Sequence, residues 1–289
     1  MKPGGIGGIG GVSVSAALDE AAELVAREIP GWAGLLAITA LPLRFLEVHF
    51  FNRLLQLGDN APGYVNHLIS LSFLIAVALL PALWGRAVFV KACALALSGR
   101  GRGISFRSAR PSFPAFVSYG YAAVVAELLF VALGWTVVAL PAIALYAGLA
   151  AATSYLQERP GPLASLAAPI RVLRVFFPFL GLTGIFAIAL FIAWLNLFVL
   201  FRLGLWLAGG ASGLDLSWWS ATMNLDNQHF LLLLLAGAMT VVEPFWLAAL
   251  VAAVRKVRAR ETGEDLVSWF SDIRAEEEIP GEPMKGTTA

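Results

Sequence analysis

The sequence predicts an all-α, polytopic integral membrane protein: a bundle of six transmembrane helices with amphipathic helices on the cytoplasmic side. Three observations predict it. Of the 289 residues, 59% are hydrophobic and only 13% are charged, several apolar stretches are long enough to cross a bilayer, and the charges between them are unevenly distributed. Soluble domains are about half apolar and about a quarter charged. A water-soluble fold of this length could not bury so much apolar surface, so the bilayer is the natural solvent.

Six apolar segments give the predicted spans, because a helix needs about 20 mostly apolar residues to cross a bilayer. The first is the weakest, since its uninterrupted apolar core covers only 32–43 and polar residues follow. That segment either spans or forms a re-entrant or interfacial helix. Together the segments make up a membrane domain over 31–260. The predicted spans are 32–57, 62–85, 112–133, 135–157, 177–207 and 229–254.

The basic residues between the spans predict the orientation. Lys and Arg follow the second, fourth and sixth spans, whereas the connections at 58–63 and 209–229 and the turn near Gly134 contain none. Loops rich in Lys and Arg stay in the cytoplasm. Both termini are therefore predicted to be cytoplasmic. Arg53 and Arg202, near the outer ends of their spans, are the exceptions.

Amphipathic and polar segments flank the membrane domain. Residues 15–30 predict a helix, because apolar residues recur on one face at helical spacing. Its polar face carries more carboxylates than basic groups, so we expect it to pack beneath the bundle against basic loops rather than to bind anionic lipid. The apolar face consists of Leu18, Ala21, Ala22, Val25 and Ile29. The other flanking predictions are a flexible Gly-rich tail over 1–14, an interfacial helix over 261–275 and a disordered acidic tail over 276–289.

Charged residues inside the spans are the sharpest signal of function, because a charge at mid-bilayer costs about 2.5–3.5 kcal/mol. Counting about 1.5 Å of rise per residue, Arg44 and Glu127 both reach the outer half of the membrane and can pair. Glu243 falls in the inner half, directly before Pro244, whose ring frees backbone carbonyls. The Glu243 carboxyl is expected to be neutral and hydrogen-bonded, to pair with Arg86, or to line a polar cavity. The candidate functional or structural polar residues are Arg44, Glu47, Glu127, Glu243 and Pro244.

The connection after the second span is a second candidate site. Its basic side chains are expected to contact anionic lipid headgroups or a protein partner, and each adds about 1 kcal/mol of attraction near an anionic surface. The orientation signal explains the same residues equally well. The candidates are Arg86, Lys91, Arg100, Arg102, Arg107 and Arg110.

No motif indicates catalysis or a cofactor. The glycine pattern at 5–10 matches the spacing of a dinucleotide-binding loop but has no room for the strand that must precede it. His49, His67 and His229 lie near the outer ends of three spans, without the spacing typical of metal ligands. We therefore expect a non-enzymatic protein with no cofactor, metal or nucleic-acid partner. The expected partners are the lipid bilayer and proteins at the cytoplasmic face, and the oligomeric state stays open.

The last span and its exit resemble a known group of proteins. Residues 241–270 read VVEPFWLAALVAAVRKVRARETGEDLVSWF: a proline-containing helix, a basic stretch, then a turn of Gly263, Glu264 and Asp265. This segment resembles the end of uncharacterised bacterial membrane proteins that are themselves similar to the membrane domain of some glycerophosphodiester phosphodiesterases. The chain departs from the family at AAVRKVRAR, where relatives often carry a Tyr and an Asp before the arginines. No phosphodiesterase catalytic domain is present, so that activity is not implied.

The resemblance implies a bacterial inner (plasma) membrane and, through relatives encoded beside a MoxR-type ATPase and transglutaminase-like membrane proteins, a part in cell-envelope assembly. Two hypotheses follow. The first is a non-enzymatic accessory or scaffold protein, which should have a tightly packed interior. The alternative is a small transporter or lipid-handling protein that uses Glu127 and Glu243, which should have a polar cavity reaching those carboxylates.

Overall fold

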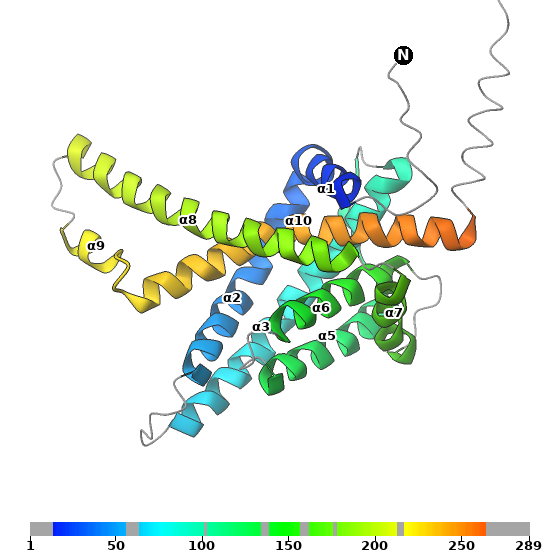
Figure 1. Ribbon diagram of the computed structural model, residues 1–289, viewed down its shortest axis with the longest axis horizontal. Helices are drawn as coiled ribbons and strands as arrows, with labels where there is room; N and C mark the ends of the chain where they lie inside the picture. The colour runs from blue at the N-terminus through cyan, green and yellow to red at the C-terminus, as the bar shows by residue number, and fades with distance from the viewer. Residues whose placement is uncertain are drawn as a thin grey trace, which may run out of the picture.

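The computed structural model describes residues 14–55, 64–100, 103–133, 139–156, 162–175, 178–212 and 217–263. All regular structure within these ranges is helical, which confirms the predicted all-α class (Figure 1). Among the helices of these ranges, five are long and apolar enough to cross a membrane. The protein is therefore a helical membrane protein.

Each predicted span corresponds to one long helix. The helices are α2 (Pro30–Leu55), α3 (Tyr64–Leu95), α5 (Phe113–Leu133), α6 (Ala139–Leu156), α8 (Pro178–Ser212) and α10 (Gln228–Thr262). The first segment, whose crossing was left open, is one continuous helix and is among the five that can span. Helix α6, which corresponds to the fourth predicted span, is shorter, with an apolar part of Ala139–Ser154. That α6 crosses the membrane stays a prediction. Several predicted segments lie wholly or mostly outside the described residues. They are the turn near Gly134, the tails over 1–14 and 276–289, and the interfacial helix over 261–275.

Two helices run beyond their predicted ends. Helix α3 continues past the predicted end of its span at residue 85 to Leu95 and passes into a π-helical turn, η2 (Ala96–Arg100), so Arg86 lies inside the helix. Helix α10 extends to Thr262 and ends at Gly263, which has a left-handed φ of 73°. Glycine adopts this conformation without a steric penalty and is the usual residue just past a helix end, as the sequence predicted.

The predicted N-terminal amphipathic helix is present as α1 (Val14–Glu23) and a π-helical turn, η1 (Leu24–Glu28). It packs against α10, where the Glu20 carboxylate lies 2.8 Å from Lys256 Nζ, so the expected contact with a basic stretch is confirmed. One residue of the predicted apolar face, Ala22, is exposed, whereas Leu24 is buried. Ala22 precedes the π turn, and Leu24 follows the buried Ala21 by three residues, so the buried face runs through Ala17, Ala21 and Leu24 at ordinary helical spacing.

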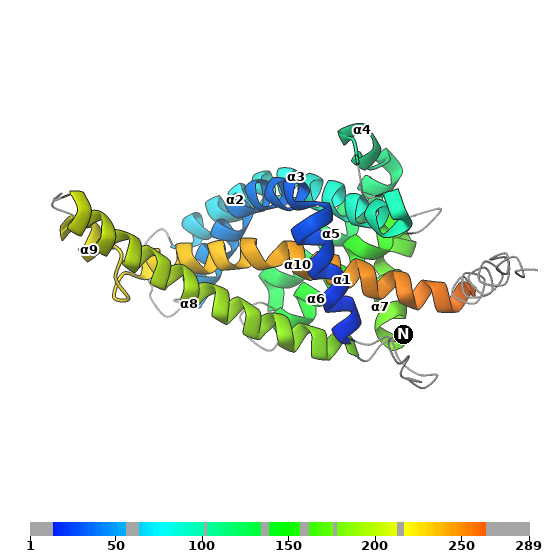
Figure 2. The ribbon, with the colours of Figure 1, turned by 90° about the horizontal axis from the view of Figure 1, so that it is seen from above.

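Helix α10 is the centre of the bundle. It contacts α1, α2, α3, α6 and α8, while α5 and α6 form a neighbouring hairpin covered by α7 (Pro162–Val175) (Figures 1 and 2). Two short helices, α4 (Phe106–Ala109) and α9 (Ser217–Thr222), lie at opposite ends of the molecule. The bundle thus has a core of α2, α3 and α10, with the hairpin on one flank and α8 on another.

Helix α8 diverges from the rest along its length. Near its start it packs on α10, with the rings of Phe186 and Trp246 4.9 Å apart. Further along, Phe201 contacts Phe230 at 5.9 Å, and beyond that the helix leaves the bundle toward α9 (Figure 1). No residue in the most apolar window of α8 is buried. Most of this helix therefore presents apolar surface outward, as a lipid-facing helix does.

A candidate functional site: the buried charge cluster

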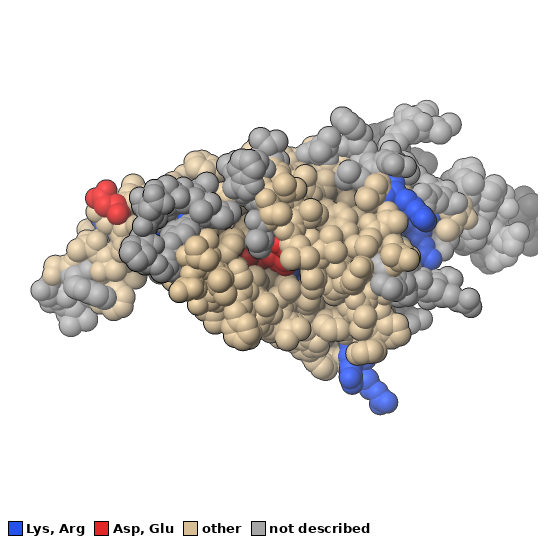
Figure 3. All heavy atoms as spheres, turned by 90° about the horizontal axis from the view of Figure 1, so that it is seen from below, with Lys and Arg blue, Asp and Glu red and all other residues tan. Residues whose placement is uncertain are grey.

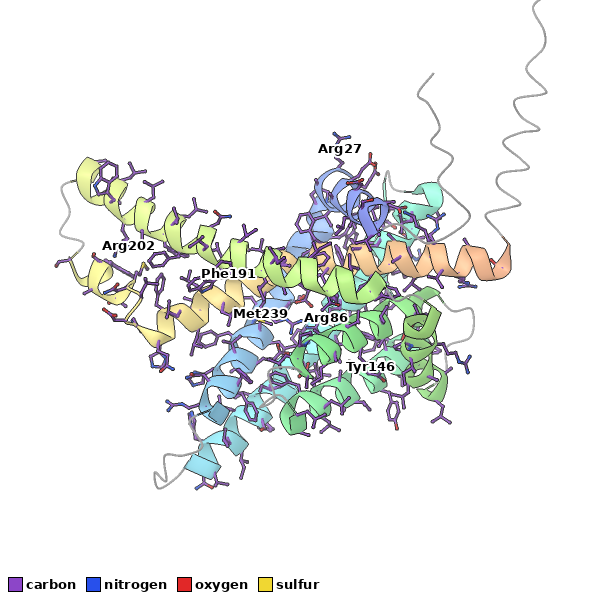
Figure 4. All side chains as sticks on the ribbon, viewed as in Figure 1. Arg27, Arg86, Tyr146, Phe191, Arg202 and Met239 are labelled. Atoms are coloured by element: carbon purple, nitrogen blue, oxygen red, sulfur yellow. The ribbon has the colours of Figure 1, made fainter. Side chains whose placement is uncertain are left out.

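Five ionisable side chains from four helices meet inside the bundle. They are referred to below as the charge cluster: Arg44 and Glu47 from α2, Arg86 from α3, Glu127 from α5 and Glu243 from α10. Figure 4 shows Arg86 in the middle of the molecule, close to where these helices cross. All the charged candidates predicted within the spans belong to this cluster.

Glu243 is the centre of the ion pairs. Its two carboxylate oxygens are each contacted by a different arginine: Oε2 lies 2.9 Å from Arg44 Nε, and Oε1 lies 2.6 Å from Arg86 Nε. Arg44 also reaches Glu47, with 2.6 Å between Nη1 and Oε2. The side chains of Glu47, Arg86 and Glu243 are only 5–6% exposed. Three helices are therefore joined through charge-assisted hydrogen bonds in a region without bulk water.

Local sequence features bring the two arginines to the same carboxylate. Arg44 and Glu47 are three residues apart and so share a face of α2. Gly85 precedes Arg86 at a close approach of α2 and α3, where an added Cβ would lie 1.9 Å from Thr39 Oγ1. Without that side chain the two helices come near enough for both guanidinium groups to reach α10.

Pro244 lies inside α10, and the helix continues through it to Thr262. Because proline has no N–H, the carbonyl of Thr240 one turn earlier loses its usual helical donor. The Thr240 hydroxyl donates to the carbonyl of Ala236 at 2.8 Å. Pro244 thus loosens the backbone ladder directly beside the residue that receives both arginines.

Glu127 approaches the cluster from the hairpin. Its carboxyl lies within hydrogen-bonding reach of Glu47 and close to both arginines. Tyr119, two turns earlier on the same face of α5, similarly lies within hydrogen-bonding reach of Arg86 and is 1% exposed. Tyr119 is not among the residues predicted from the sequence. The signal available was its spacing of eight residues from Glu127, which places both on one helix face.

The pairing differs from the one predicted between Arg44 and Glu127. Arg44 binds Glu47 and Glu243 instead. The side chains of Arg44 and Glu243 therefore meet at one depth, and their predicted placement in opposite halves of the membrane is wrong. Counting residues along straight helices ignores helix tilt and the length of an arginine side chain. The alternative in which Glu243 pairs with Arg86 is the one found.

The second candidate site loses one residue. Arg86 is buried and bound to Glu243, so it does not join a lipid-facing or partner-facing basic surface. Lys91 Nζ donates to the carbonyl of Arg110 at 2.5 Å, and the side chains of Arg107 and Arg110 are exposed. The side chain of Arg100 and the whole of Arg102 lie outside the described residues.

The three histidines come together at the other end of the bundle. The ring of His49 lies 6.1 Å from that of His67 and 6.0 Å from that of His229, measured between centroids. Beside them Gln228 Nε2 donates to Asn52 Oδ1 at 2.7 Å. Within the described ranges, however, no group of three or more His, Cys, Asp or Glu side chains is arranged to hold a metal ion.

Two hollows stand out on the described surface, and neither is lined by the charge cluster. One, of about 350 Å³, lies at the α1–α2 elbow over residues 28–32 and Leu35. The other, of about 430 Å³, is apolar and lies between the outer part of α8 and the segment after α9. Its lining residues are Leu197, Leu200, Phe201, Gly204, Leu205 and Met223.

Comparison with known proteins returned no match: no protein-family model, no curated protein and no solved structure matches this chain.

Proposed function

We propose that this protein is a non-enzymatic accessory or scaffold protein of the bacterial inner membrane, with both termini in the cytoplasm and a part in cell-envelope assembly. The observation that carries the proposal is the way the intramembrane charges contact one another. Arg44 and Arg86 are both bound to Glu243, and neither of the two hollows reaches them. Charges arranged in this way hold helices together, whereas a transport site leaves polar groups facing a cavity.

Helix α1 and the π turn that follows it supply the surface for a partner. Their apolar face is buried and Lys256 holds Glu20, whereas Asp19, Glu23 and Glu28 are exposed. The cytoplasmic leaflet is anionic and attracts basic rather than acidic segments. The acidic face is therefore suited to a partner protein with a basic surface.

The proposal predicts that this acidic face is required for partner binding. Asp19, Glu23 and Glu28 are changed together to Lys, and the tagged full-length protein is purified in mild detergent for mass spectrometry of stoichiometric partners. We expect the wild type to retain one defined partner and the variant to lose it, with unchanged yield and elution. The matched control is Asp226→Lys, an exposed carboxylate at the opposite end, which should keep the partner. A partner-free wild type that carries bound lipid or solute would contradict the proposal.

A lipid-handling role is the second candidate, and one observation favours it. Arg202 Nη1 lies 3.4 Å from the carbonyl of Met223, which lines the apolar hollow, and Figure 4 shows Arg202 between α8 and α9. A groove for an acyl chain beside a cation for a phosphate suits an anionic lipid. Filling the hollow with Gly204→Leu should then remove a lipid that co-purifies with the wild type, as measured by native mass spectrometry.

A further inference from the structure

We propose that Glu127 and Glu47 share a single proton and together form a proton-binding site inside the membrane, which fastens α5 to the core of α2, α3 and α10. This goes beyond the scaffold function, because it assigns a ligand to the charge cluster and a condition under which one helix is released.

The first step concerns the ion pairs of the two arginines. In the part of the chain that the structure describes, the ion pairs of Arg44 and Arg86 go to Glu47 and Glu243, and none goes to Glu127. The side chain that Glu127 meets is another carboxyl, that of Glu47. An ionised carboxylate accepts hydrogen bonds and cannot donate one. Contact between these two groups therefore requires a proton on one of them.

The second step is the charge balance. The cluster contains two guanidinium groups and three carboxyls, so full ionisation would leave a net charge of −1 inside the membrane. One proton makes the cluster neutral, which a low-dielectric surrounding favours. Glu243 already holds two arginines and Glu47 holds one. The proton consequently resides on Glu127 and is donated to Glu47.

The third step concerns the groups on every element around Glu127. Helix α2 contributes Glu47 and Arg44, and α3 contributes Arg86. Glu243 of α10 and Tyr119 of α5 both interact with Arg86. Helices α6 and α7 also pack on α5, but none of their described side chains is among the groups acting on Glu127.

The fourth step concerns how exposed the three carboxyls are. Glu127 is partly exposed, whereas Glu47 and Glu243 are each 5% exposed. Figure 3 shows acidic atoms, with a few basic atoms beside them, in the middle of a face that is otherwise mostly uncharged. Glu127 is therefore the carboxyl of the cluster nearest the surface of the bundle. Loss of the proton would leave two carboxylates in contact, and their repulsion would separate α5 from α2.

The test is infrared spectroscopy of the full-length protein in detergent or lipid. A protonated carboxylic acid has a C=O stretching band that an ionised carboxylate lacks and that shifts in D₂O. We expect this band in the wild type at neutral pH and its loss in Glu127→Gln, while the control Glu20→Gln leaves it unchanged. Absence of the band from the wild type, or its persistence unchanged in Glu127→Gln, would overturn the proposal.

A second measurement is independent of that variant's spectrum. An unfolded chain releases the Glu127 proton near the ordinary carboxyl pKa of about 4.3, whereas the folded state keeps it at neutral pH. The contribution of Glu127 to thermal stability should therefore fall as pH rises from about 4.3 through neutrality. Glu127→Gln keeps a hydrogen-bond donor that does not titrate, so its unfolding temperature should change less over the same range. An unfolding temperature that depends on pH equally in the wild type and in Glu127→Gln would overturn the proposal. If the variant does not fold, absence of the protonated carboxyl band from the wild type still overturns it.

Discussion

Glu243→Leu is expected to lower the stability of the bundle more than any other single substitution, by about 3–5 kcal/mol. The substitution removes the carboxylate that both Arg44 and Arg86 bind and leaves buried guanidinium charge without a partner. An unpaired charge is far more costly than a missing pair, because desolvation is no longer compensated. The measurement is reversible unfolding of the purified protein by titration with denaturing detergent.

Two control variants make this result specific. Glu20→Leu breaks the pair with Lys256, whose side chains are 31% and 35% exposed, and should cost at most about 1 kcal/mol. Adding Arg86→Met to Glu243→Leu should recover part of the loss, because it removes the stranded cation while Arg44 keeps Glu47. If Glu243→Leu were as mild as Glu20→Leu, the charge cluster would not hold the helices together.

Gly85→Ala is the second large effect, with an expected loss of about 1–3 kcal/mol from overpacking. The new Cβ would lie 1.9 Å from Thr39 Oγ1 and 2.9 Å from Thr39 Cβ. The Thr39 hydroxyl is held by the carbonyls of Leu35 and Leu36, both at 3.0 Å, so it cannot rotate away without losing those bonds. Helices α2 and α3 must separate instead, and the same unfolding titration measures the cost.

Gly120→Ala is the matched control on α5, since nothing lies within 4 Å of the added atom. Alanine has the higher helix propensity, so this variant should be neutral or up to about 1 kcal/mol more stable. Combining Gly85→Ala with Thr39→Ala should restore part of the stability, because residues in contact show coupled effects. Equal stability of Gly85→Ala and Gly120→Ala would mean that the helices are not in close contact at Gly85.

The fold class and the long helices could be predicted because apolar length is a local property. The region 112–133 contains one charge, and α5 occupies almost the same residues. Helix ends were predicted less well where tertiary contacts decide them. The second predicted span ends at residue 85 because a charge usually ends a span, but Glu243 neutralises Arg86, so this charge lies within the bundle and α3 continues to Leu95.

The members of the charge cluster could also be predicted, because charges in apolar segments are conspicuous. Their partners could not. Arg44 and Glu243 are separated by 199 positions in the chain, and their contact depends on helix tilt and on the close approach at Gly85. Tyr119 was missed for a related reason, because an aromatic residue within an apolar helix has no distinguishing feature until its neighbours are known.

The central claim is that the intramembrane charges stabilise the protein and are not its working site. The most direct test replaces the whole cluster by apolar residues: Arg44→Met, Glu47→Leu, Arg86→Met, Glu127→Leu and Glu243→Leu. Well-packed apolar groups can substitute for buried ion pairs with little or no loss of stability. We expect this variant to elute as the wild type does and to retain the same partner in the same stoichiometry. A folded variant that has lost its partner would contradict the claim. So would a folded variant that no longer complements a deletion strain.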